Sequence, residues 1–183
     1  MKIIATKIEG VFEIVHLVQD DRRGCFMESY YKQSLSEHRL EYIFIQDNHS
    51  FSNQKGTIRG LHFQIEPRAQ TKLVRCTKGQ IIDVAVDVRK GSPTYKKWVA
   101  VELSEDNKKE MLIPKGFAHG YVTLCDNTEV QYKVDEYYSP ENDRSIRFDD
   151  PEFGIDWGIE NPILSDKDLQ APLLLESDAN FTY

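Results

Sequence analysis

The sequence contains no apolar run long enough to cross a membrane. A membrane helix needs roughly 20 apolar residues, and no stretch of the chain approaches that length. The first ten residues, MKIIATKIEG, are interrupted by Lys2, Lys7 and Glu9, so they do not read as a secretory signal. We therefore expect no membrane partner and predict a cytoplasmic protein.

Cysteine and positive charge are both in short supply. The three cysteines, Cys25, Cys76 and Cys125, lie far apart and form no Cys-x-x-Cys pair, which excludes a disulfide frame and a zinc knuckle. Lysine and arginine number 23 against 30 acidic residues, for a net charge of −7. This balance argues against nucleic acid as a partner, although a few arginines can still build a local pocket for a small anion.

Short β-rich runs separated by turn-forming residues make up most of the chain. The runs are Val11–Val18, Tyr42–Gln46, Thr71–Cys76, Gln80–Val88, Trp98–Leu103, Met111–Ile113 and Thr128–Tyr138. Turn segments such as SNQKG and RKGSP lie between them. Regular spacing of this kind predicts an all-β sandwich or barrel, with short helices only at Tyr31–Arg39 and Ser165–Leu169. We expect residues 1–183 to form one domain, as the length suggests.

Alternation within one run places a tyrosine on an apolar face. Tyr132 shares its face with Val130 and Val134, because side chains along a strand alternate between the two faces. This face is expected to point into the barrel, where a hydroxyl needs a partner and an acid can be kept dry. Two interpretations stay open at this point: a proton donor, and a core tyrosine bonded to a backbone carbonyl.

Polar side chains crowd one strand-like segment, GTIRGLHFQIEPRAQTK, which contains Arg59, His62, Gln64, Gln70 and Lys72. An isolated histidine is more often a core residue than a catalyst, but a buried stretch rarely holds so many polar groups unless they face a cavity. Arg59 and His62 have opposite parity, so an ideal strand would send them to opposite faces. A bulge near Gly60, or a site at the end of the strand, would reconcile the two.

The segment IPKGFAHG, residues 113–120, resembles the second cupin motif, in which a Pro-x-Gly-x-x-His turn points a histidine into a barrel. Metal-binding cupins supply His-x-His from a companion segment, and here that place reads His62-Phe63-Gln64. A catalytic transition metal usually needs about three protein ligands. Because only His62 and His119 are on offer, we expect no catalytic metal.

Together these segments resemble the dTDP-4-dehydrorhamnose 3,5-epimerase family. The matching stretches include DRRGCFMESY, QDNHSFS, GTIRGLHFQ, QTKLVR, IPKGFAHGY, VQYKVDEYYSP and LSDKD, in the family's order and over roughly residues 10 to 170. The resemblance implies a double-stranded β-helix jelly roll, cupin-like, and a homodimer. It also implies epimerisation of dTDP-4-dehydro-6-deoxy-D-glucose at C3 and C5, which yields dTDP-4-dehydro-L-rhamnose.

The resemblance also assigns roles to residues by matching position. It makes His62 the general base, Asp168 its carboxylate partner, Tyr132 the acid on the opposite face of the sugar, and Lys72 the residue beside the C4 oxygen. The nucleotide-sugar contacts that it implies are Arg23, Phe26, Glu28, Gln46, Asn48, Arg59, His119, Tyr138, Asp143 and Lys167, with Phe26 and Tyr138 stacking on the thymine. The family often has glutamate where this chain has the shorter Asp143.

The implied reaction needs no cofactor, because the C3 and C5 protons of a 4-keto sugar are acidified by the adjacent carbonyl. Inversion requires a base on one face, an acid on the other and a positive group for the enolate oxygen. Histidine titrates near neutrality and therefore suits the role of base.

Three alternatives remain at the level of sequence. They are a monofunctional 3- or 5-epimerase of another deoxysugar pathway, a non-catalytic sugar-nucleotide-binding cupin, and a metal-dependent cupin enzyme. The complete set of His62, Lys72, Tyr132 and Asp168 argues against a simple binder, because binding alone needs no acid–base pair.

Overall fold

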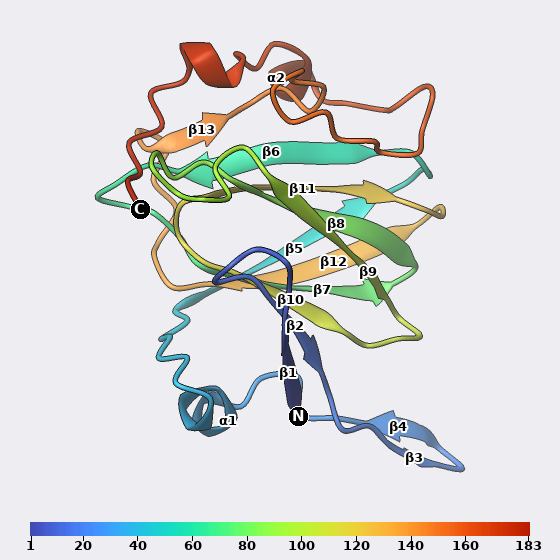
Figure 1. Ribbon diagram of the computed structural model, residues 1–183. Coiled ribbons are helices and arrows are strands. Elements are labelled where there is room, and N and C mark those ends of the chain that lie inside the picture. Colours follow the sequence, from blue (N-terminus) through green and yellow to red (C-terminus); the bar gives the residue numbers. More distant parts are fainter.

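Two antiparallel sheets face each other in the computed structural model, which describes residues 1–183 (Figure 1). The six-stranded sheet contains, in spatial order, β1 (Lys2–Ala5), β2 (Phe12–Val15), β10 (Glu110–Ile113), β7 (Lys72–Lys78), β12 (Thr128–Val134) and β5 (Gln46–Ser52). The five-stranded sheet contains β13 (Asp143–Ser145), β6 (Ile58–Gln64), β11 (Phe117–Thr123), β8 (Gln80–Asp87) and β9 (Trp98–Ser104). Strands distant in sequence are neighbours in both sheets, as in the jelly roll predicted from the sequence.

Three apolar clusters hold the sheets and their coverings together. Between the sheets lie residues such as Val74, Ile81, Met111 and Val130. The outer face of the five-stranded sheet is covered by the C-terminal part of the chain, with Val86, Phe153, Trp157 and Phe181 among the buried residues. Both faces of that sheet are therefore buried, which explains why β8 reads as a nearly continuous apolar run.

A third cluster lies on the outer face of the six-stranded sheet, where helix α1 (Lys32–Glu37) packs Leu35 against Leu73 and Leu112. Tyr42 and Phe44 pack against the same cluster, and residues 41–45 form no strand. The strand predicted at Tyr42–Gln46 is therefore wrong. The actual strand, β5, begins where that run ends; its alternating polar residues face a cavity on one side, so it lacks an apolar pattern.

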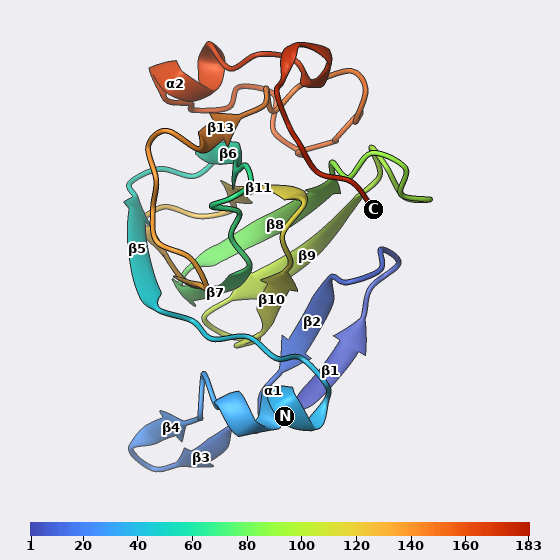
Figure 2. The same cartoon turned by 90° about the vertical axis from the view of Figure 1, so that its left-hand side faces the viewer.

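The two ends of the molecule carry different elements. Helix α2 (Asp166–Leu169) lies over β6 at one end, near the short 3-10 helix η1 (Leu174–Glu176). The hairpin of β3 (Gln19–Asp21) and β4 (Gly24–Phe26) projects from the opposite end, as both views show (Figure 2). No helix of the structure is long and apolar enough to span a membrane.

Candidate active site

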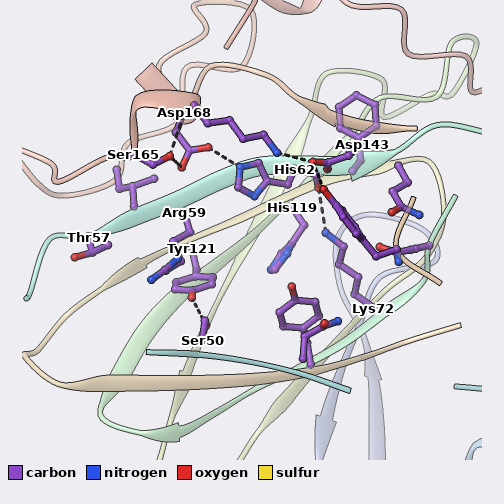
Figure 3. A pocket seen from close by; sticks show the side chains of 18 of the residues that line it. Ser50, Thr57, Arg59, His62, Lys72, His119, Tyr121, Asp143, Ser165 and Asp168 are labelled. Carbon is purple, nitrogen blue, oxygen red and sulfur yellow. Dashed lines mark hydrogen bonds and ion pairs between the residues drawn. The ribbon is translucent and has the colours of Figure 1, made fainter. Parts of the chain in front are cut away.

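A cavity of about 490 Å³ opens between the two sheets beneath α2 (Figure 3). Its lining combines basic, acidic, amide and aromatic side chains: Gln46, Asn48, Ser50, Thr57, Ile58, Arg59, His62, Phe63, Gln64, Gln70, Lys72, His119, Tyr121, Tyr132, Tyr138, Asp143, Ile163, Leu164, Ser165, Lys167 and Asp168. Eleven of the fourteen site residues predicted from the sequence therefore meet in one place.

A bulge in β6 brings Arg59 and His62 into this cavity. Arg59 pairs with Tyr121 and His62 with His119, so two residues of β6 lie opposite one of β11. Gly60 makes the bulge possible, because it has a φ of 126° and an added Cβ would lie 2.5 Å from the backbone of the facing strand. Of the two explanations offered for the parity of Arg59 and His62, the bulge is confirmed.

His62 and Asp168 are joined by a short hydrogen bond although they lie 106 residues apart. The distance from His62 Nε2 to Asp168 Oδ1 is 2.5 Å, and Ser165 Oγ donates to the other carboxylate oxygen at 2.9 Å. Burial alone would raise the pKa of Asp168, but the hydrogen bond from His62, the charge of His62 and the Ser165 and Lys167 contributions together lower it. The carboxylate therefore stays ionised and can orient the imidazole and stabilise its protonated form.

Lys72 and Tyr132 enter the cavity from β7 and β12, in the sheet that faces His62. Lys72 is 8% exposed, and its Nζ donates to the His62 carbonyl oxygen at 3.2 Å. Burial lowers the pKa of Lys72 to about 8, against the opposing charges of Asp143 and Asp83. Burial also raises the pKa of Tyr132, with Arg59 acting in the opposite direction, so this phenol keeps its proton at neutral pH. The prediction that Tyr132 faces the barrel interior is confirmed.

A second histidine–carboxylate pair joins His119, which lines the cavity, to the fully buried Asp83. The Nε2 atom of His119 lies 2.7 Å from Asp83 Oδ1, and burial lowers the pKa of His119 despite this neighbour. Nearby, the hydroxyls of Ser50 and Tyr121 are 2.7 Å apart (Figure 3). The sequence reasoning missed Asp83, Ser50 and Tyr121 as site residues. Asp83 could have been noticed from the sequence, because it is a charged residue in the middle of an apolar strand.

Charged and amide side chains surround the mouth of the cavity. Asp143 Oδ2 accepts from Lys167 Nζ at 2.6 Å and from the Tyr138 hydroxyl at 3.3 Å. Gln46 donates from Nε2 to Asn48 Oδ1 at 2.9 Å. The side chain of Asp143 thus reaches side chains from α2 and from the segment before β13.

Three predicted binding residues, Arg23, Phe26 and Glu28, lie outside the cavity. They belong to the β3–β4 hairpin and the residue stretch after it, at the end of the molecule opposite α2 (Figure 1). Arg23 forms an ion pair with Asp21, and Phe26 is 67% exposed. A single copy of the chain does not bring these residues to the remaining site.

The cavity offers no set of three or more His, Cys, Asp or Glu side chains placed to hold a metal ion. Where metal-binding cupins have the second histidine of His-x-His, the amide of Gln64 is engaged with the backbone of neighbouring segments. The residues present therefore do not fit a catalytic transition-metal site.

The fold and the cavity define a class of protein. A jelly roll holds a histidine bonded to a carboxylate on one sheet, with a tyrosine and a buried lysine entering from the facing sheet, and side chains of these types can move protons and stabilise an oxyanion.

The comparison with known proteins names the family. The model of dTDP-4-dehydrorhamnose 3,5-epimerase matches residues 5–176, and the chain belongs to this family. An epimerase of that name from Escherichia coli (strain K12) is 51% identical over 171 residues, which cover 92% of this chain and 91% of the relative.

Two solved structures are also similar to the chain. The Legionella pneumophila dTDP-6-deoxy-D-glucose-3,5-epimerase in complex with dTDP-4-keto-L-rhamnose has a TM-score of 0.95 at 44% identity and covers 100% of this chain and 98% of its own. A 3′-monoepimerase from Streptomyces bikiniensis in complex with dTDP-quinovose has a TM-score of 0.89 at 30% identity and covers 94% of this chain and 87% of its own.

Proposed function

We propose that the protein converts dTDP-4-dehydro-6-deoxy-D-glucose to dTDP-4-dehydro-L-rhamnose by inverting C3 and C5. The observation that carries the proposal is the hydrogen-bonded His62–Asp168 pair on one sheet side of the cavity, with Lys72 and Tyr132 entering from the facing sheet. Family membership and the Legionella relative with its bound dTDP-4-keto-L-rhamnose support the same reaction.

In this mechanism His62 removes the proton from C5 or C3, and the electron pair of the C–H bond moves into the C4 carbonyl to form an enolate. Asp168 stabilises the imidazolium, and the ammonium of Lys72 stabilises the negative oxygen. Tyr132 then donates a proton to the same carbon from the opposite face, and proton exchange with water restores both groups. Each inversion consumes and returns one proton, so no cofactor takes part.

The remaining cavity residues hold the nucleotide part of the substrate. Arg59 is suited to the diphosphate because its planar guanidinium matches phosphate oxygens. Tyr138 is 57% exposed at the mouth, where its ring can stack on the thymine. Lys167 adds positive charge beside it.

We further propose a cytoplasmic homodimer in which the hairpin of each copy completes the cavity of the other. The hairpin carries the predicted contacts Arg23 and Phe26, with Glu28 just after it, and it lies at the end of the molecule opposite α2 (Figure 2). Phe26 and the nearby Leu17, exposed by 67% and 71%, are apolar surfaces that a second copy would cover. Sedimentation of the protein, together with dTDP binding by an Arg23→Ala variant, tests this assembly.

Proton NMR in D2O with dTDP-4-keto-6-deoxyglucose tests the reaction. Deuterium at both C3 and C5 supports the double epimerase. Deuterium at one centre supports the alternative of a single-centre epimerase, which the similarity to the Streptomyces 3′-monoepimerase favours. Absence of deuterium at both centres contradicts either activity and leaves a nucleotide-sugar binder.

As a second check, Tyr132→Phe should keep part of the deprotonation and lose inversion at one or both centres. Normal epimerisation by this variant would assign the acid to another residue.

A further inference from the structure

The side-chain amide of Gln64 forms three hydrogen bonds to backbone groups. It is 3% exposed at the end of β6, although it lines the cavity. Its Nε2 donates to the carbonyl oxygens of Arg68 at 2.6 Å and of Tyr137 at 3.2 Å, and its Oε1 accepts from the Ser139 N–H at 2.7 Å. Both N–H groups of this amide are used by backbone carbonyls and its oxygen accepts a backbone N–H, so all three bonds hold the backbone of the same chain.

Two of the three bonds grip the residues on either side of Tyr138. This segment connects β12 in one sheet to β13 in the other (Figure 2), and Tyr138 within it and Asp143 at its end line the cavity. A second glutamine, Gln46 from β5, accepts the N–H of Tyr138 through Oε1 at 3.2 Å. The backbone around Tyr138 is therefore held from both sheets, by Gln46 of the six-stranded sheet and by Gln64 of the five-stranded sheet.

The side chain of Tyr138 also contacts the charged residues at the mouth of the cavity. Gln64 pairs in register with Asp143 on β13, and Asp143 accepts from the Tyr138 hydroxyl and from Lys167. The side chain of Tyr138 is thus fixed at both its ends: at the backbone by the amides, and at the hydroxyl by Asp143.

We propose that Gln64 is a positioning residue that sets the orientation of Tyr138 for the base of the nucleotide. The proposal rests on the proposed function in one respect, the contact of Tyr138 with the nucleotide base. Only an amide satisfies this position, because two carbonyl oxygens need a donor and one N–H needs an acceptor on the same side chain.

The test compares Gln64→Glu and Gln64→Met with the unaltered protein. The glutamate presents an oxygen to two carbonyl oxygens, and the methionine keeps the bulk but removes all three hydrogen bonds. We expect the Kd for dTDP and the KM for dTDP-4-keto-6-deoxyglucose to rise about tenfold in both variants, the scale of one base–aromatic stacking contact. The kcat should change less than about twofold, because His62, Lys72 and Tyr132 are untouched.

A double-variant cycle separates positioning of Tyr138 from a general loss of structure. Tyr138→Ala should weaken dTDP binding by a similar factor, and the Gln64→Met/Tyr138→Ala double variant should be no weaker than Tyr138→Ala alone. If the double variant instead bound dTDP more weakly than Tyr138→Ala, by the product of the two single effects, the proposal would be overturned. A kcat that falls as much as KM rises would overturn it too. Unchanged dTDP binding by both Gln64 variants would overturn it as well.

Asn107→Asp serves as the matched control. Asn107 is also an amide that clamps a loop, donating to the Glu102 carbonyl at 2.9 Å and accepting from the Ser104 and Lys109 N–H groups. It is not part of the cavity, and its change to aspartate should leave dTDP binding and KM as they are. Failure of the proposed function is a different result: the unaltered protein would then show neither dTDP binding nor deuterium uptake.

Discussion

Two histidine–carboxylate pairs, each with its histidine lining the cavity, differ in their access to water. The side chain of His62 is 31% exposed and its partner Asp168 comes from a separate helix, whereas the side chains of His119 and Asp83 are 7% and 0% exposed and come from neighbouring strands. Asp168 has a second hydrogen bond from Ser165, but the second oxygen of Asp83 has no partner. The partly exposed His62–Asp168 pair is called the open pair below, and the buried His119–Asp83 pair is called the sealed pair.

The environment of each pair determines which role its histidine can take. A base must reach the substrate and must carry a positive charge for part of the cycle. The open pair allows both, because His62 is partly exposed and the ionised Asp168 beside it has a hydrogen bond to each of its oxygens. In the sealed pair burial disfavours the charged form, so His119 suits the role of a neutral hydrogen-bonding group. The predictions below test the contrast, beginning with the largest effect.

Replacing each histidine by alanine should give unequal losses. In His62→Ala, exchange of the C3 and C5 protons with D2O should fall by roughly 10³-fold or more, because the base is gone. In His119→Ala the loss should be about tenfold, from one hydrogen bond to the substrate. NMR exchange rates measure both, with far-UV circular dichroism as the check on folding. Exchange at the unaltered rate in His62→Ala would assign the base elsewhere.

Removing the charge of Lys72 should slow the reaction and change its pH profile. Lys72→Met should lower kcat by about 10² to 10³, the effect of losing one donor to a developing oxyanion. In the unaltered protein the charged form exists below the pKa of about 8, so kcat/KM should fall as the pH rises through that value. The variant should lack this alkaline fall. A profile that keeps the fall would assign it to another group.

Neutralising Asp168 should cost less than removing His62. Asp168→Asn keeps the shape but cannot stabilise the imidazolium, and we expect kcat to fall about 10²-fold. Ser165→Ala removes only the supporting hydrogen bond and should reduce kcat by less than about tenfold. Steady-state kinetics measure both, and equal losses in the two variants would contradict the ordering.

The sealed pair should also affect the pH dependence of stability. The pKa of His119 in the folded protein lies below its ordinary value of 6.5, so the unfolded chain takes up a proton that the folded one resists. The stability contributed by neutral His119 is therefore present above pH 6.5 and is lost as the pH falls below it, by at most about 1.4 kcal/mol per pH unit.

Urea unfolding above and below pH 6.5 measures this effect. His119→Gln should show a weaker loss of unfolding free energy on acidification than the unaltered protein. The exposed His38 provides the control, because His38→Gln should keep the original pH dependence. The same dependence in all three proteins would show that His119 does not contribute.

Much of the fold followed from local pattern. Alternation predicted the inward face of Tyr132, and opposite parity suggested the bulge at Gly60, because both depend on the two-residue period of a strand. The prediction for Tyr42–Gln46 was wrong because its aromatic residues pack outside the sheet beside α1. An apolar run alone does not reveal which surface it covers.

The site was less accessible to reasoning from local pattern. Polar crowding pointed to His62 and Lys72, and the turn motif pointed to His119. The partner of His119, Asp83, became visible only when β8 and β11 were paired. The hydroxyl pair of Ser50 and Tyr121 likewise joins two strands that lie in different sheets.

By itself, then, the sequence determined the short strands, their turns, the inward or outward direction of individual side chains, and, through its motifs, the family. Apart from what the family resemblance implied, only the tertiary structure decided which polar groups meet. His62 and Asp168 come together because the C-terminal segment packs over the five-stranded sheet and lays α2 on β6. Packing of this kind depends on contacts across the whole chain, and no local period records it.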